Sequence, residues 1–184
     1  MKMPEVVNIV GTGNLGCSIN YYHILDSVEL PRLQYDPDIH QGLELRFIDQ
    51  GPLVTIYSTG KYIIRANSFE LLSETRNNLL QLMSEIDYID EPIGVEFNIN
   101  NIVYSGELGR EVNLSALSDD LQLGEVVYDP ESHPALRCRI SEQDSTIMLF
   151  RTGKITVVGA DTLDKARSAY GDFLVAINQL FRTR

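Results

Sequence analysis

An internal repeat with a fixed spacing of 93 residues limits what this chain can fold into. The matched pairs are Asn8-Ile9-Val10 with Asn101-Ile102-Val103, Tyr35-Asp36-Pro37 with Tyr128-Asp129-Pro130, His40 with His133, Arg46 with Arg139, and Thr59-Gly60-Lys61 with Thr152-Gly153-Lys154. Five matches in one register indicate a tandem duplication of a unit of about 90 residues. We therefore expect two equivalent repeats, residues 1–93 and 94–184.

The pattern within one repeat predicts a small α+β unit. Strands are expected at Glu5–Val10, Leu43–Ile48, Leu53–Ser58 and Lys61–Ala66. Turns of hairpin length join the last three strands, which indicates antiparallel pairing. Helical spacing of apolar residues predicts a short helix at Ser18–Asp26 and a long one from about Ser68 to Ile86. The second repeat has its own long helix, with an apolar stripe from Leu163 to Phe181 behind a cap at Asp161 or Thr162.

The predicted strands lack the clean apolar–polar alternation of a sheet with one wet face. Thr146–Phe150 does not alternate, and Leu53–Tyr57 alternates only weakly. One face must pack on the helices of its repeat, which leaves a second face that is largely apolar. A large exposed apolar surface is typical of a binding site, and burial against an unseen element is the alternative.

Composition excludes several classes of protein. A net charge of −11, from 15 basic and 26 acidic residues, is unlike that of a general nucleic-acid binder, which is usually basic. The sequence has no apolar run long enough for a membrane span, and we expect no membrane partner. Two cysteines without metal-ligand spacing, Cys17 and Cys138, favour an intracellular protein without a disulfide framework.

A literal dinucleotide-binding fingerprint, Gly11-Thr12-Gly13-Asn14-Leu15-Gly16, lies between a predicted strand and a predicted helix. Two observations count against a nucleotide site. The second repeat has Tyr104 in place of Gly11, and the hairpin turns leave no crossover helices for a parallel sheet. No nucleophile motif is present, and His40 and His133 are repeat mates rather than a metal cluster. We expect no catalytic residue, no metal, no cofactor and no enzyme activity.

Several segments resemble the TATA-binding protein family, in an archaeal-like form. They are residues 8–17, both Tyr-Asp-Pro segments, Tyr57-Ser58-Thr59-Gly60-Lys61, Phe150-Arg151-Thr152-Gly153-Lys154 and Val158-Gly159-Ala160. The resemblance covers the chain from about Glu5 to Phe181. It implies an α+β saddle, in which two tandem repeats form a curved ten-stranded antiparallel sheet with four helices on the convex face.

The resemblance also implies a general transcription initiation factor that binds and bends A/T-rich promoter DNA through the minor groove. The family's DNA-contacting positions fall on Asn8, Val10, His40, Arg46, Thr55, Tyr57, Thr59, Lys61, Ile63, Arg65, Asn101, Val103, His133, Arg139, Met148, Phe150, Thr152, Lys154, Thr156 and Val158. Two of the family's four wedging phenylalanines are replaced by His40 and His133, and threonines of the last strands are replaced by Arg65 and Val158.

Seven of these positions have an alternative interpretation without DNA. Arg65 could enter a narrowed groove or be a solubilising charge on an edge strand. Asn8 and Asn101 could serve turns or strand pairing, Tyr57 and Phe150 could pack in the core, and the two histidines could be polar replacements at abandoned positions.

The implied partners are double-stranded TATA-like promoter DNA, transcription factor B and, indirectly, the RNA polymerase machinery. Asp129 and Glu131, within the acidic segment 128–132, are the expected contacts for transcription factor B. The expected location is the cytoplasm, at the nucleoid, if the source is archaeal, or the nucleus if it is eukaryotic. The competing hypothesis is an interaction module of the same fold whose DNA binding is weakened by the altered wedge residues.

Overall fold

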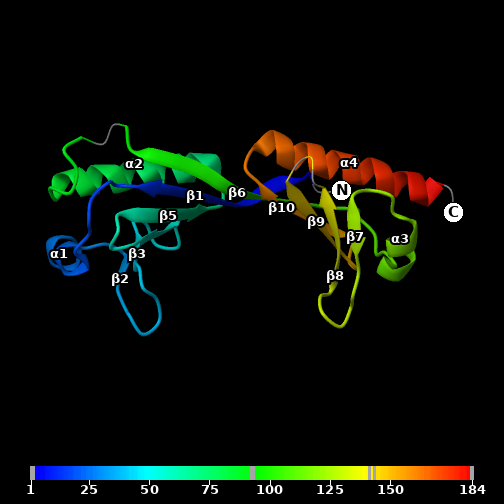
Figure 1. The fold of residues 1–184 in the computed structure, drawn as a ribbon, viewed down its shortest axis with the longest axis horizontal. Helices are drawn as coiled ribbons and strands as arrows, with labels where there is room; N and C mark the ends of the chain where they lie inside the picture. Colours follow the sequence, from blue (N-terminus) through cyan, green and yellow to red (C-terminus); the bar gives the residue numbers. More distant parts are fainter. Residues whose placement is uncertain (1–2, 92–93, 141, 143, 183–184) are drawn as a thin grey trace. The chain divides into compact units, whose positions relative to one another are not determined.

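The computed structural model describes residues 3–91, 94–140, 142 and 144–182 (Figure 1). These residues form ten strands and four helices. In chain order they are β1 (Glu5–Asn14), α1 (Tyr21–Ser27), β2 (Arg32–Gln34), β3 (Leu43–Arg46), β4 (Leu53–Ile56), β5 (Lys61–Ala66), α2 (Phe69–Glu85), β6 (Glu96–Glu107), α3 (Leu114–Asp120), β7 (Glu125–Val127), β8 (Ala135–Ile140), β9 (Ser145–Phe150), β10 (Lys154–Ala160) and α4 (Leu163–Arg182).

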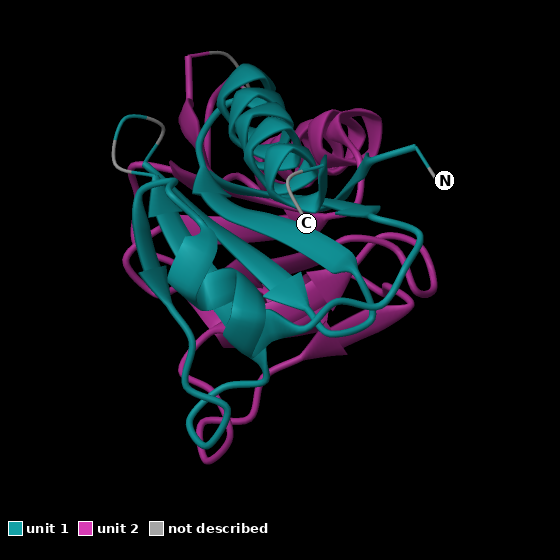
Figure 2. Cartoon of the chain, turned by 90° about the vertical axis from the view of Figure 1, so that its right-hand side faces the viewer, with its two compact units in different colours: residues 1–7, 101–184 teal, residues 8–100 magenta. Residues whose placement is uncertain are grey.

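The chain divides into two compact units (Figure 2). One unit is residues 8–100, here called the first unit, and the other, the second unit, is residues 1–7 with 101–184. The strand order is β2-β3-β4-β5-β1 in the first unit and β6-β10-β9-β8-β7 in the second, and the strand pairs described within each unit are antiparallel. The repeat boundary expected after residue 93 falls at residues 92–93, outside the described residues.

The two long helices begin at capping residues and bury one face each. The Ser68 hydroxyl accepts a hydrogen bond from the Leu71 backbone N–H at 3.2 Å, and α2 then buries Leu79 and Met83 completely. The Thr162 hydroxyl accepts from the Lys165 N–H at 3.3 Å, and α4 follows. Both long helices are confirmed, and within the described residues no helix combines the length and hydropathy that a bilayer crossing requires.

The glycines of the apparent dinucleotide fingerprint lie inside a strand. β1 continues to Asn14, four residues beyond the predicted end, and pairs with β5. A Cβ at Gly11 would overlap the ring of Phe97, and one at Gly13 would overlap the ring of Tyr62. These two rings stack with their centroids 6.1 Å apart. The glycines therefore let aromatic rings pack directly on the strand backbone, which accounts for them without a bound phosphate.

Other predicted boundaries were wrong by a few residues. The helix expected from Ser18 begins at Tyr21, because Asn20 is the cap and its side-chain oxygen accepts from the Tyr22 N–H at 3.1 Å. The three-residue strands β2 and β7 were not predicted, since such short segments carry no periodic signal of their own. Pairing with β3 and β8 makes them strands.

Candidate nucleic-acid interface

In each unit one face of the sheet packs on the long helix and the other, here called the open face, does not. In the first unit the fully buried Val54, Ile56 and Ile64 point toward the helix side. Because side chains alternate along a strand, their neighbours point the other way. The registers Val10 to Arg65 and Thr55 to Ile63 therefore lie on the open face. The predicted residues on this face are Asn8, Val10, Arg46, Thr55, Tyr57, Lys61, Ile63 and Arg65.

The second unit repeats this arrangement. Ile147, Leu149 and Val157 are fully buried on the helix side. Met148 pairs with Thr156, and both lie on the open face. The predicted residues there are Asn101, Val103, Arg139, Met148, Phe150, Lys154, Thr156 and Val158. The structure thus brings the strand residues of each repeat onto one face, and Thr59 and Thr152 lie in the turns that join β4 to β5 and β9 to β10.

Each predicted histidine lies beside the predicted aromatic residue of its own repeat. The ring centroids of His40 and Tyr57 are 5.9 Å apart, and those of His133 and Phe150 are 6.4 Å apart. The interplanar angles, 51° and 49°, are nearly the same. Tyr57 and Phe150 are half-buried on the open face rather than enclosed in the core. Sequence positions 17 residues apart therefore form one ring pair in each unit.

The two matched asparagines differ in their surroundings. The Asn101 side-chain oxygen accepts a hydrogen bond of 2.7 Å from the backbone N–H of Gly159, at an irregularity in β10 where φ is +96°. This bond leaves the two N–H donors of the Asn101 amide for another acceptor. In the first unit β5 pairs regularly with β1, and the Asn8 side chain makes no hydrogen bond to any described residue. The alternative interpretation, a role in strand structure, therefore applies to Asn101 and not to Asn8.

Arg65 does not lie on an edge strand, so that interpretation is wrong. β5 is flanked by β4 and β1, and the Arg65 guanidinium donates to the Thr55 hydroxyl at 3.2 Å. Thr55 is only 1 % exposed, and Thr156 only 8 %. The two threonines are on the open face but are covered by neighbouring side chains.

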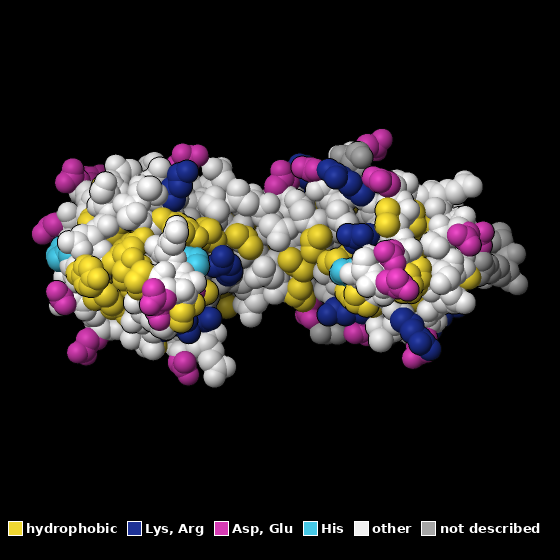
Figure 3. Space-filling view, turned by 60° about the horizontal axis from the view of Figure 1, so that its bottom comes forward, with side chains coloured by type: hydrophobic (Ala, Val, Ile, Leu, Met, Phe, Trp, Pro, Cys, Tyr) yellow, Lys and Arg dark blue, Asp and Glu magenta, His cyan; other side chains and the backbone are white. Residues whose placement is uncertain are grey.

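Charge is distributed unevenly between the open faces and the rest of the chain. All charged residues in the strand registers described here lie on the open faces. The basic ones are Arg32, Arg46, Lys61, Arg65, Arg137, Arg139 and Lys154, and the acidic ones are Glu44, Glu107 and Glu125. Seven basic against three acidic residues reverses the balance of the whole chain, which has 15 and 26. Figure 3 shows basic side chains and a histidine next to hydrophobic ones in both units.

Some open-face residues were missed from the sequence. Arg137 lies two residues before Arg139 on β8, so the period of two in a strand could have identified it. Arg32 lies on the unpredicted strand β2 and forms a salt bridge with Glu44. No motif in the sequence marks that pair.

The acidic segment is a tight loop between β7 and β8. The Asp129 carboxylate accepts from the Glu131 backbone N–H at 3.1 Å, and the Asp129 carbonyl accepts from the His133 N–H at 2.9 Å. The Ser132 side chain, followed by that Glu131 N–H, holds the pKa of Asp129 below its usual range. Asp129 therefore shapes the loop, whereas the Glu131 carboxylate makes no interaction with a described residue.

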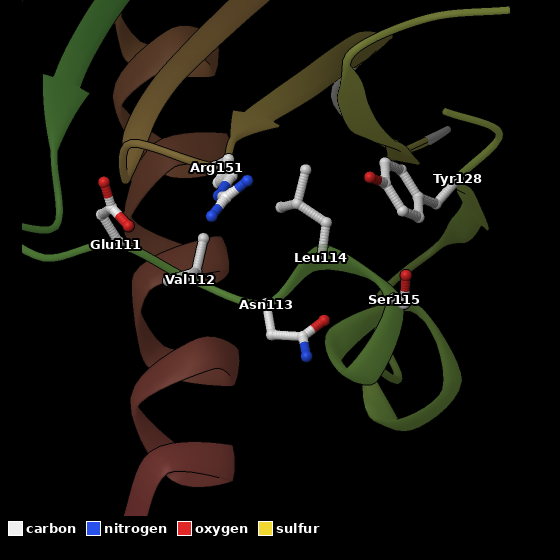
Figure 4. Close-up of a pocket in the computed structure, with 7 residues that line it drawn as sticks. All are labelled: Glu111, Val112, Asn113, Leu114, Ser115, Tyr128 and Arg151. Atoms are coloured by element: carbon white, nitrogen blue, oxygen red, sulfur yellow. The ribbon is translucent and has the colours of Figure 1, made fainter. Parts of the chain in front are cut away.

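A pocket of about 480 Å³ lies beside this loop in the second unit. Its lining residues are Glu111, Val112, Asn113, Leu114, Ser115, Tyr128 and Arg151. Tyr128 and Arg151, which directly follow β7 and β9, lie on opposite sides of Leu114 (Figure 4). At the matching place in the first unit, the Tyr21 ring packs 4.5 Å from that of Tyr35.

The fold and the open faces define a duplicated α+β protein whose sheets present basic, amide and apolar side chains rather than a catalytic cleft. A family model described as "Transcription factor TFIID (or TATA-binding protein, TBP)" matches residues 3–86 and 96–180. TATA-box-binding protein C of Halobacterium salinarum is 34 % identical and covers 96 % of this chain and 98 % of its own. TATA-box-binding protein 2 of Haloferax volcanii is 31 % identical, with coverages of 96 % and 94 %.

The chain belongs to the TATA-binding protein family. Among solved structures, Methanococcus jannaschii TBP superposes with a TM-score of 0.78 at 24 % identity, over 97 % of this chain and 99 % of that one. This likeness confirms the expected fold class, and the two separate family matches confirm the tandem repeat. The family consists of transcription factors, so the prediction that the chain is not an enzyme is also confirmed.

Proposed function

We propose that this protein is a general transcription initiation factor that binds A/T-rich promoter DNA in the minor groove through its open faces. The observation that carries the proposal is the excess of basic over acidic side chains on those faces, seven to three among the strand residues in the described registers, in a chain of net charge −11. Basic side chains supply phosphate contacts, and apolar side chains between them suit the floor of a groove.

The asparagines are the proposed reading groups. An A·T pair presents only acceptors in the minor groove, whereas a G·C pair adds the guanine amino donor. The amide of Asn101, anchored through its oxygen by Gly159, has its N–H groups left to meet such acceptors. Asn8 is proposed to act in the same way, with Val10 and Val103 as apolar neighbours.

Bending is proposed to come from the half-buried aromatic residues on the open faces. Minor-groove binders, of which this family is the usual example, insert apolar side chains between base steps and kink the duplex. Tyr57 and Phe150 occupy matched positions for that role. Arg46, Lys61, Arg139 and Lys154, with Thr59 and Thr152 in the turns, are the proposed phosphate contacts.

Recruitment of transcription factor B is proposed at the loop that holds Asp129 and Glu131. The Glu131 carboxylate is exposed and makes no interaction with a described residue. The pocket lined by Tyr128 lies next to the same loop. Contact with RNA polymerase would then be indirect. The archaeal relatives support a protein that works at the nucleoid in the cytoplasm.

The test is energy transfer across an end-labelled TATA duplex, with and without transcription factor B, over a salt series and against a G·C-scrambled control. We expect a TATA-dependent rise in transfer that weakens as salt increases. Asn101→Asp keeps an acceptor for Gly159 but removes the amide donors, so binding should fall at least tenfold while thermal stability holds. Glu131→Arg should weaken the partner complex only. No binding at any salt would leave an interaction module of the same fold.

A further inference from the structure

The structure assigns a role to His40 and His133 that goes beyond the wedge positions they replace. Each lies at the end of a loop that leads into β3 or β8, with its ring beside the aromatic residue of its own unit. The two environments were built from different neighbours, Tyr57 in one unit and Phe150 in the other. Two features of the histidines are nevertheless common to both units.

The first common feature is a hydrogen bond from the chain to Nδ1. The backbone N–H of Gly42 donates to Nδ1 of His40 at 2.9 Å, and the backbone N–H of Ala135 donates to Nδ1 of His133 at 3.0 Å. The carbonyl oxygens of the same two residues lie farther from Nδ1, at 3.4 Å. A backbone N–H can only donate, so Nδ1 must accept. The neutral ring then carries its proton on Nε2.

The second common feature is that Nε2 is unused and accessible. Neither Nε2 atom has a hydrogen-bond partner among the described residues. In that same part of the chain the buried polar side-chain atoms without a partner are Tyr62 Oη and Arg76 Nε. Neither Nε2 atom is among them, so both keep some exposure to solvent on half-buried rings. Among the described residues no group of three His, Cys, Asp or Glu side chains could hold a metal there.

We propose that His40 and His133 are specificity-determining residues that donate a hydrogen bond from Nε2 to the N3 or O2 acceptors of A·T pairs in the minor groove. This inference rests on the proposed DNA binding. A fixed N–H donor meets an acceptor at every A·T pair, but at a G·C pair it faces the guanine amino group, which is also a donor. The histidines would add base discrimination at positions where a phenylalanine ring could only stack.

The tautomer can be tested without DNA. Long-range proton–nitrogen correlation spectra of protein labelled in its three histidines distinguish a proton on Nδ1 from one on Nε2. We expect the Nε2–H form for His40 and His133, assigned with single His→Asn variants. His23 is the comparison, because its Nδ1 lies 3.3 Å from the Tyr88 hydroxyl and receives no hydrogen bond from the backbone N–H of a described residue. The Nδ1–H form in either ring would overturn the proposal.

The contact with the base is tested by replacing adenines, one at a time, with 3-deazaadenine, which lacks the N3 acceptor. Wild-type affinity should drop about fivefold at two sites. The variants are His40→Phe with His133→Phe, which keep a ring without a donor, and His40→Asn with His133→Asn. Asn keeps an acceptor for the backbone N–H at the position of Nδ1, but its own N–H groups lie at the position of Cδ2 and leave no donor where Nε2 was. Both pairs should lose the drop at those sites.

The outcomes separate this inference from the function on which it rests. If the wild type prefers TATA but all three proteins give the same deazaadenine scan, the histidine contacts are absent and the proposed function stands. If the wild type shows no preference for TATA over the scrambled duplex, both fall. Thermal unfolding of the Phe and Asn variants checks that they remain folded, and the Asn pair covers the case in which the Phe pair does not.

Discussion

In the first unit the rings of Tyr62 and Phe97 pack over the glycines of β1, whereas in the second unit Tyr104 on β6 packs edge-on against Tyr170 from α4. The repeat mate of Gly11 is Tyr104, so one repeat supplies a ring where the other supplies space for one. Both arrangements fill the volume between sheet and helix. The two repeats therefore place aromatic rings between sheet and helix from different positions of the chain.

On the open faces some residues are the same in both repeats and others differ. The histidine–aromatic pair, Arg46 with Arg139, and the matched asparagines occur in both repeats. Arg65 has Val158 as its mate, and only β10 has the irregularity at Gly159 that anchors Asn101. Core strand positions such as Ile9 and Ile102 or Leu43 and Leu136 therefore stayed apolar. Open-face positions also changed in charge, since the mates of Arg32 and Glu44 are Glu125 and Arg137, and these changes make the two repeats chemically distinct.

The largest expected effects are equal in the two repeats. Gly60 and Gly153 are repeat mates with φ of +83° and +86°, and a Cβ at either would collide with a backbone carbonyl, of Cys17 or Arg110. Gly60→Ala and Gly153→Ala should each lower the free energy of unfolding by about 3 kcal/mol or more. Gly16 and Gly109 also have positive φ but open space around them, so their Ala variants should cost about 1 kcal/mol. Urea denaturation measures both, and equal costs for all four would contradict the argument.

A pH effect is expected from Cys138, a buried thiol that has no cysteine as its mate in the first repeat. Cys138 is fully buried, donates to the Leu123 carbonyl at 2.6 Å, and has its pKa raised by burial from 9.0 to about 11, while its mate is Leu45. The unfolded thiol loses its proton at lower pH than the folded one. The Cys138 thiol therefore contributes fully to the free energy of unfolding below pH 9. About 2 kcal/mol of that contribution is lost as the pH rises from 9 to 11.

The measurement is the difference between wild-type and Cys138→Ala stability across that range. Tyr62 and Tyr170, whose pKa values burial also raises, are common to both proteins and cancel. Parallel pH profiles for the two proteins would show that the thiol does not contribute.

Arg65 tests the charge asymmetry of the open faces. Arg65→Val makes the first repeat resemble the second, and it should weaken TATA binding about fivefold at low salt and reduce the salt-dependence slope by about one. Val158→Arg should act in the opposite direction. Fluorescence anisotropy over a salt series measures both, and an unchanged slope for Arg65→Val would mean that this guanidinium stays on Thr55 when DNA binds.

The smallest effects are expected at the end of each unit. The Tyr22 and Tyr35 rings lie 6.4 Å apart in an edge-on contact, whereas the mate of Tyr22 is Ser115, beside Tyr128. Ser115→Tyr should raise stability by about 0.5 kcal/mol, and Tyr22→Ser should lower it by a similar amount. Thermal unfolding measures both, and a change of the same sign in the two variants would rule out equivalent sites.

The repeat, the long helices and the hairpin pairing of the strands could be predicted from the sequence, whereas the positions on the open face came from the resemblance to the family. Periodicity in strands and helices carries that information directly, as for Lys61–Ala66, whose predicted and observed bounds agree. The short strands β2 and β7 could not be predicted, because partner strands rather than their own residues make them strands. The pocket at Leu114 and Ser115 was also missed, although these residues stand where the other repeat has the larger rings of Tyr21 and Tyr22.

The sequence by itself determined that this chain is a duplicated α+β protein, because the fixed offset of 93 residues, the hairpin turns and the helical spacing of apolar residues can be read from the residue order. Only the tertiary structure decided what the histidines present and which asparagine is anchored. Those properties depend on hydrogen bonds from Gly42, Ala135 and Gly159 to particular side-chain atoms. Such bonds require distances near 3 Å between groups, and no spacing in a sequence specifies them.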